Sequence, residues 1–230
     1  MHTPEALSTD DPHGHTGLEF AHHFDDWQQE YQSKSLGMWL FLVTEVMFFG
    51  GMFLVYMVYR YQFTPAFDAS SRLLNLWAGA INTVVLLASS FTVALAVHAA
   101  HLGNRKMLVR LLAATLLLGV VFLGIKAYEY SEKFQPGHQL VPVAGWAFDY
   151  HGPEPQQAKL FFGLYFAMTG VHALHMIIGI GIFVYLLWFA RQGRYTGGNF
   201  VSVELAGLYW HFVDIIWIFL FPLLYLVDRS

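Results

Sequence analysis

Five stretches of the sequence are continuously apolar, at about 36–60, 73–102, 107–130, 159–190 and 204–227. An α-helix needs about 20 such residues to cross the roughly 30 Å hydrocarbon core of a bilayer. A transmembrane barrel would instead show shorter segments of about ten residues with alternating polarity. The sequence therefore predicts an all-α integral membrane protein, built as a bundle of five transmembrane helices.

The composition supports a membrane location. Hydrophobic residues make up 56% of the 230 positions and charged residues only 12%, a balance that a water-soluble domain could hardly hide from solvent. The formal net charge is -4, and the sequence lacks basic clusters with interleaved aromatic residues, which argues against nucleic acid as a partner. Because the chain has no cysteine, it offers neither a disulfide nor a thiolate metal site.

A polar N-terminal tail, residues 1–35, precedes the transmembrane domain at 36–230. The tail contains several histidines without a regular metal-ligand spacing, so a solvated segment is the favoured interpretation over a metal site. These histidines are His2, His13, His15, His22 and His23.

Ionisable residues inside the apolar runs are the candidate functional positions. His211 and Asp214 stand at i and i+3 of the last run, on one face of the expected helix. An aspartate near the middle of a span costs about 2.5 to 3.5 kcal/mol on insertion scales, so it must be neutralised or paired. We favour a polar pair that holds two helices together over a proton-handling role.

Glu45 lies near the middle of the first run. At this position a neutral hydrogen-bonding group and a proton donor are equally compatible with the sequence.

Two more polar pairs occur at helical spacing. Lys126 and Glu129 can pair on one face near the end of the third run, close to the headgroups, and a structural role is the simpler interpretation. His172 and His175 lie one turn apart on the fourth run, and a metal site there would need a ligand from another helix, so a packed polar pair is favoured. Small residues on this run favour close helix packing; they are Gly163, Ala167, Gly170 and Ala173.

The histidines do not form the facing pairs that grip haem iron in a membrane cytochrome. A copper centre would require cysteine or a tight histidine cluster. We therefore infer a chain with no redox cofactor, no metal site and no catalytic residues of its own.

Four ordered motifs resemble subunit III of haem-copper oxidases, most closely the short, five-helix form of bacterial cytochrome c oxidase subunit III. The resemblance covers about residues 35–228. The motifs are Gly37–Leu42 running into Thr44–Phe49, Lys126–Tyr130, Thr169–His175 and Trp210–Asp214.

This resemblance implies a non-catalytic accessory subunit of a proton-pumping terminal respiratory oxidase that reduces dioxygen to water. Such a subunit stabilises catalytic subunit I and assists its proton uptake, while haem and copper reside in the partner subunits and phospholipid binds to the subunit itself. By motif position, Arg191 is expected near lipid headgroups. The expected buried polar or proton-related residues are Glu45, Glu129, His172, His175, Glu204, His211 and Asp214.

The resemblance also implies a location in the bacterial inner membrane, with a cytoplasmic N-terminus and an external C-terminus. Lysine and arginine are almost equally divided between the two sides, so the positive-inside rule does not decide the orientation.

The chain begins at what would be the third helix of larger family members. The lipid cleft of those members depends on the two preceding helices. Two alternatives remain, namely subunit III of a quinol oxidase and an independent proton or ion transporter that uses Glu45 and Asp214.

Overall fold

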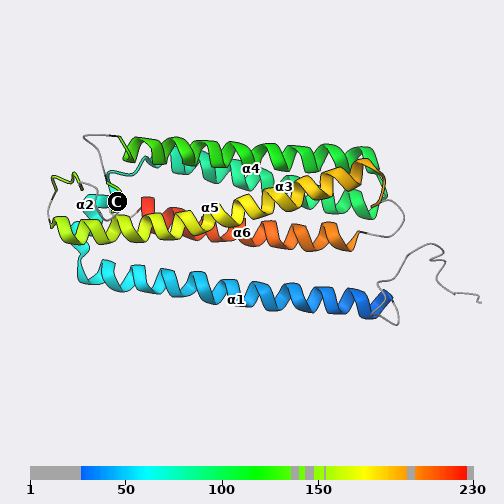
Figure 1. Ribbon diagram of the computed structural model, residues 1–230, viewed down its shortest axis with the longest axis horizontal. Coiled ribbons are helices and arrows are strands. Elements are labelled where there is room, and N and C mark those ends of the chain that lie inside the picture. The colour runs from blue at the N-terminus through cyan, green and yellow to red at the C-terminus, as the bar shows by residue number, and fades with distance from the viewer. Residues whose placement is uncertain (1–26, 136–139, 143–147, 153, 196–199, 227–230) are drawn as a thin grey trace, which may run out of the picture.

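The computed structural model describes residues 27–135, 140–142, 148–152, 154–195 and 200–226. Within these ranges every regular element is a helix, and five long helices lie side by side (Figure 1). The long helices are α1 (Trp27–Gln62), α3 (Leu76–His101), α4 (Arg105–Lys133), α5 (Pro155–Arg191) and α6 (Val201–Tyr225), and a short helix, α2 (Thr64–Ser71), follows α1.

Each of the five long helices is long and apolar enough to cross a membrane. The predicted all-helical, multi-pass fold is therefore confirmed. Helix α1 begins at Trp27 and its candidate span at Tyr31, so the last residues of the predicted polar tail are helical. The histidines of the tail lie outside the described residues.

Helices α3, α4, α5 and α6 form a closed ring in which each helix packs against the next and α6 returns to α3. The turn between α3 and α4 illustrates how the sequence produces this antiparallel packing. Gly103 has a φ of 63°, a left-handed conformation that glycine adopts without strain. The Asn104 side chain then accepts a hydrogen bond from the Met107 backbone N–H at 3.2 Å and caps α4.

Trp210 of α6 fills the middle of this ring and is fully buried. Its indole Nε1 donates to the hydroxyl of Ser89 on α3 at 2.9 Å. The indole ring lies against two glycines, because a Cβ added at Gly119 of α4 would be 2.8 Å from it and one at Gly179 of α5 would be 2.9 Å away. Both glycines therefore make room for one large side chain that contacts three neighbouring helices.

Helix α1 lies outside this ring and packs against α5 and α6 (Figure 1). Its buried side chains Leu42, Phe49 and Tyr56 recur every seven residues, the spacing of a narrow coiled-coil seam. Most of its other apolar side chains are exposed, with Met47 at 73%. The residues between Ser35 and Tyr59 that are not exposed follow steps of mainly three and four, and are Ser35, Met38, Leu42, Glu45, Phe49, Met52, Phe53, Tyr56 and Tyr59.

Candidate functional site: polar groups between the helices

A cluster of four buried polar side chains joins α4, α5 and α6. Lys126 Nζ donates to Glu129 Oε2 at 2.9 Å, to the Tyr225 hydroxyl at 2.9 Å and to the Tyr165 hydroxyl at 3.3 Å. The two tyrosine hydroxyls donate in turn to Glu129 Oε1, at 2.9 Å from Tyr165 and 2.7 Å from Tyr225. All three N–H donors of the ammonium group therefore have acceptors. We call these four residues the Lys126 cluster.

Burial explains why the Lys126 cluster needs all these bonds. Lys126 is 3% and Glu129 1% exposed, and the loss of hydration of a buried ion pair is offset only when further hydrogen bonds complete it. The ammonium nitrogen also lies 5.1 Å from the centre of the Trp217 ring, within the range of a cation–π interaction. The predicted Lys126–Glu129 pair is confirmed, but it lies inside the bundle, because side chains of α5 and α6 enclose it.

A second polar contact joins α1 to α5. His175 Nε2 lies 3.2 Å from Glu45 Oε2, an ion-pair approach without the alignment of a hydrogen bond. His175 Nδ1 lies 2.9 Å from the backbone carbonyl oxygen of Val171, and since a carbonyl only accepts, we assign a hydrogen to Nδ1. This contact therefore brings a carboxyl group of α1 and an imidazole of α5 together.

The other histidine of the expected pair has different surroundings. His172 is buried at 1% exposure, with its ring centre 5.6 Å from that of Phe122 and 5.3 Å from that of Trp217. Neither ring nitrogen has a hydrogen-bond partner among the described residues. His172 and His175 therefore do not act as one packed pair, because one points into the ring of helices and the other toward α1.

His211 and Asp214 are likewise separated in the structure. His211 Nδ1 lies 2.6 Å from the Ser90 hydroxyl of α3, so this histidine does connect two helices, as predicted. Asp214 is 2% exposed, and within the described part of the chain neither of its carboxyl oxygens has a hydrogen-bond partner. The two residues share a helix face but do not pair with each other.

The remaining candidates lie at the end of the bundle where α6 begins and α5 ends. Glu204 Oε1 lies 2.7 Å from His101 Nε2 of α3. Arg191, in the last turn of α5, lines a pocket of about 410 Å³ whose other charged residues come from the start of α4. We call the four cations around it the basic pocket, and they are Arg105, Lys106, Arg110 and Arg191.

Several partners could not be found from the sequence. The tyrosines of the Lys126 cluster, Tyr165 and Tyr225, are far from Lys126 in the chain. Ser90 and His101 are also far from their partners on α6. The sequence spacing indicates only contacts within one helix, such as that between Lys126 and Glu129 at positions i and i+3. Among the described residues, no group of three or more His, Cys, Asp or Glu side chains is placed to hold a metal ion.

The fold and these contacts define a multi-pass helical membrane protein whose ionisable groups lie between its helices. A sequence model of the family described as cytochrome c oxidase subunit III matches residues 21–135 and 147–228. The chain belongs to the cytochrome c oxidase subunit III family. The family resemblance seen in the motifs is therefore confirmed.

Curated relatives cover most of the chain. Cytochrome c oxidase subunit 3 of Thermostichus vulcanus is 31% identical over 92% of this chain and 93% of its own length. A probable cytochrome c oxidase subunit 3 of Nocardia farcinica is 33% identical over 84% and 87%, respectively. A probable quinol oxidase subunit 3 of Staphylococcus saprophyticus is 27% identical over 90% and 95%. The chain is accordingly a third subunit of a haem-copper oxidase, of the cytochrome c or the quinol type, and part of an oxidase complex.

Proposed function

We propose that this chain is a non-catalytic accessory subunit that stabilises the catalytic subunit of a proton-pumping terminal oxidase and assists its proton uptake. In this proposal the catalytic subunit reduces dioxygen to water with its own haem and copper. The observation that supports the proposal best is the contact between Glu45 and His175, 3.2 Å apart. This contact joins a carboxyl group and an imidazole on the narrow seam that holds α1 to the other helices, within two helices long and apolar enough to cross a membrane.

The variant Glu45→Gln tests this role. We expect the initial rate of oxygen consumption by the assembled complex to stay close to that of the wild type, while activity declines faster during sustained turnover or proton uptake slows. The reason is that the substitution removes the carboxyl partner of His175 and weakens the packing of α1 by about 0.6 to 1.7 kcal/mol. Oxygen polarography and a pH-sensitive dye in vesicles measure both effects.

His175→Gln should reproduce the effect of Glu45→Gln, since it removes the other partner of the same contact. Glu154→Gln serves as the matched control, because Glu154 is exposed at the start of α5 and outside the bundle. Loss of the first turnovers in a Glu45→Gln complex that is fully assembled would contradict an accessory role and indicate a catalytic one.

We further propose that the basic pocket binds the phosphate of an anionic phospholipid. All four of its cations are exposed, and among the described residues none of them has a carboxylate within ion-pair distance. They come from the first residues of α4 and the last turn of α5, at one end of the bundle. Such basic pockets between helix ends attract anionic headgroups.

Arg110→Gln combined with Arg191→Gln is expected to weaken retention of anionic phospholipid by roughly thirtyfold, at about 1 kcal/mol for each cation removed. Quantifying the lipids that stay bound to the purified complex at increasing detergent washes measures this loss. Lys159→Gln, which removes an exposed cation at the other end of α5, is the control. Unchanged lipid content in the double variant would contradict the proposed site.

The orientation proposed for the chain places the beginning of α1 in the cytoplasm of a bacterium and the end of α6 outside. Family membership supports this orientation, whereas the positive-inside rule does not decide it, because lysine and arginine are almost equally divided between the two ends of the bundle. The electron donor, cytochrome c or quinol, is a separate question that donor oxidation by the purified complex answers. Family membership favours an oxidase subunit over an independent transporter.

A further inference from the structure

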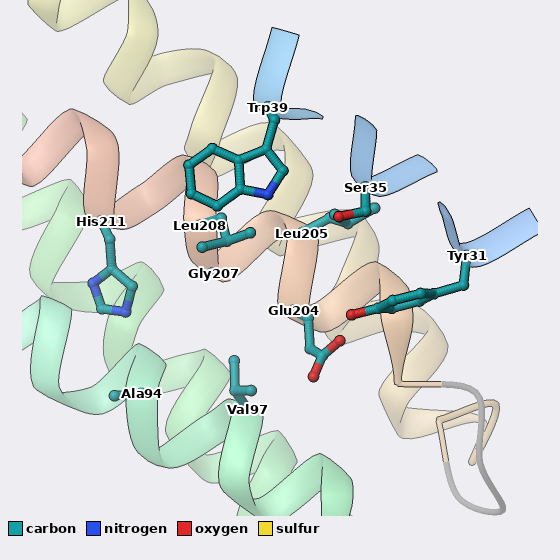
Figure 2. A pocket seen from close by; sticks show the side chains of 10 residues that line it. All are labelled: Tyr31, Ser35, Trp39, Ala94, Val97, Glu204, Leu205, Gly207, Leu208 and His211. Carbon is teal, nitrogen blue, oxygen red and sulfur yellow. The ribbon is translucent and has the colours of Figure 1, made fainter. Parts of the chain in front are cut away.

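A pocket of about 500 Å³ lies between α1, α3 and α6 (Figure 2). Glu204 and Tyr31 lie toward one end of it and His211 toward the other (Figure 2). Glu204 belongs to the first turn of α6, so its end of the pocket lies near the membrane surface. His211 is seven residues further along the same helix, about 10.5 Å deeper at 1.5 Å per residue.

Both ends of the pocket carry polar groups that the described protein only partly satisfies. His211 binds Ser90 through Nδ1, which leaves Nε2 without a hydrogen-bond partner among the described residues. Glu204 is bound to His101 through Oε1, and its second oxygen has no such partner in the same part of the chain. A hydrocarbon chain cannot satisfy either group, because it neither donates nor accepts hydrogen bonds.

Asp214 provides an independent observation. It follows His211 by one helical turn, is 2% exposed and has no hydrogen-bond partner for either carboxyl oxygen within the described residues. Buried polar groups of this kind are normally satisfied by protein or by internal water. Asp214 does not line the pocket, but His211, one turn before it on α6, does. The pocket of about 500 Å³ far exceeds the roughly 10–15 Å³ of accessible volume that a water molecule needs.

We propose that this pocket is a water-filled inlet that leads from the membrane surface at Glu204 to His211 and carries water, and with it protons, toward Asp214. Its apolar walls, which include Trp39, Val97 and Leu208, would also accept a lipid chain. The polar groups of Glu204 and His211 at its two ends favour water over a lipid chain, because a lipid chain cannot form hydrogen bonds with them. The inlet is a property of this chain alone and does not depend on the proposed role in proton uptake by the catalytic subunit.

Cysteine labelling in the oxidase complex tests the inlet. Because the chain has no cysteine of its own, an introduced cysteine is the only thiol in this subunit. Ala94→Cys and Val97→Cys place a thiol on the pocket wall, whereas Ile177→Cys places one on an exposed position of α5, where Ile177 is 55% exposed. The charged reagent methanethiosulfonate ethyltrimethylammonium is applied to both sides of vesicles that contain the complex, and the mass of this subunit reports the modification.

Only the thiolate reacts, and it forms in water but not in hydrocarbon, so the two pocket cysteines should react at least about tenfold faster than Ile177→Cys. Ser90→Cys, behind the pocket wall next to His211, should also react. Adding Ala94→Phe to Ser90→Cys should then reduce its labelling by about tenfold, since the new ring fills the route to it. Variants are compared only in complexes that retain the haem spectrum of the wild type.

Two results would overturn the inlet. If the pocket cysteines react no faster than Ile177→Cys with the charged reagent but do react with membrane-soluble N-ethylmaleimide, and a photoactivatable phosphatidylcholine crosslinks to them, a lipid chain fills the pocket. If they react with neither reagent, another subunit covers it. If the complex with Ala94→Phe and Ser90→Cys fails to assemble, the labelling of Val97→Cys alone distinguishes water from a lipid chain or another subunit.

Discussion

Replacing Lys126 with methionine is expected to cause the subunit to dissociate from the oxidase complex under conditions in which the wild type stays bound. The substitution leaves the Glu129 carboxylate, buried at 1% exposure, without the cation that is hydrogen-bonded to it. Removing one partner of a buried ion pair typically costs about 3 to 5 kcal/mol, which is a large part of the stability of a domain. The content of this subunit in the purified complex after graded detergent washes, together with the thermal stability of the complex, measures the effect.

A double variant separates a lost charge from lost packing. Lys126→Met with Glu129→Leu should recover much of the stability, because two apolar residues of similar size can replace a buried ion pair at little cost. Recovery should be incomplete, since the hydroxyls of Tyr165 and Tyr225 lose the acceptor that they share. Lys106→Met, at an exposed position of α4, controls for the loss of a positive charge. Equal stability of Lys126→Met and the wild type would show that the cluster does not hold α4, α5 and α6 together.

Gly179→Ala and Gly119→Ala are expected to destabilise the bundle by about 1 to 3 kcal/mol each, the usual cost of overpacking a core. At both positions the added Cβ would come within 3.0 Å of the buried Trp210 ring. The indole cannot move aside freely, because its Nε1 is bonded to Ser89 and its far edge lies between two helices. Thermal denaturation of the complex and the yield of this subunit measure the loss.

Neighbouring glycines supply matched controls for these variants. Gly181 on α5 and Gly124 on α4 have no atom within 4 Å of an added Cβ. Alanine at either position should be neutral or slightly stabilising, because alanine has the higher helix propensity. A smaller side chain at position 210, as in Trp210→Leu, should also reduce the additional cost of Gly179→Ala. If Gly179→Ala and Gly181→Ala behave alike, the close approach of Trp210 does not limit the packing.

The Lys126 cluster illustrates the limit of prediction from the sequence. The spacing of Lys126 and Glu129 predicted their pairing, because i and i+3 positions of a helix lie on the same face. It could not predict that Tyr165 of α5 and Tyr225 of α6 complete the pair, since those contacts depend on which helices are neighbours and at what depth. The pairing of Glu45 with His175 required the same information.

The predictions for the histidines failed in part for a related reason. One-turn spacing places His172 and His175 on the same side of α5, but a helix side can contact two different neighbours. His172 packs against aromatic rings of α4 and α6, whereas His175 reaches α1. His211 and Asp214 also differ, because His211 is bonded to Ser90 while Asp214, near the same hydroxyl, has no well-formed hydrogen bond among the described residues.

The sequence alone determined that the chain is a multi-pass helical membrane protein, because the length of an apolar run suffices to recognise a span, and its motifs pointed to the family. Only the tertiary structure decided which helices form the ring, that α1 is held along a single seam, and which buried polar groups have partners. The physical reason is that hydrophobicity places a helix in the bilayer without specifying its neighbours. Close packing and hydrogen bonds between helices make that choice, and they join residues that are far apart in the chain.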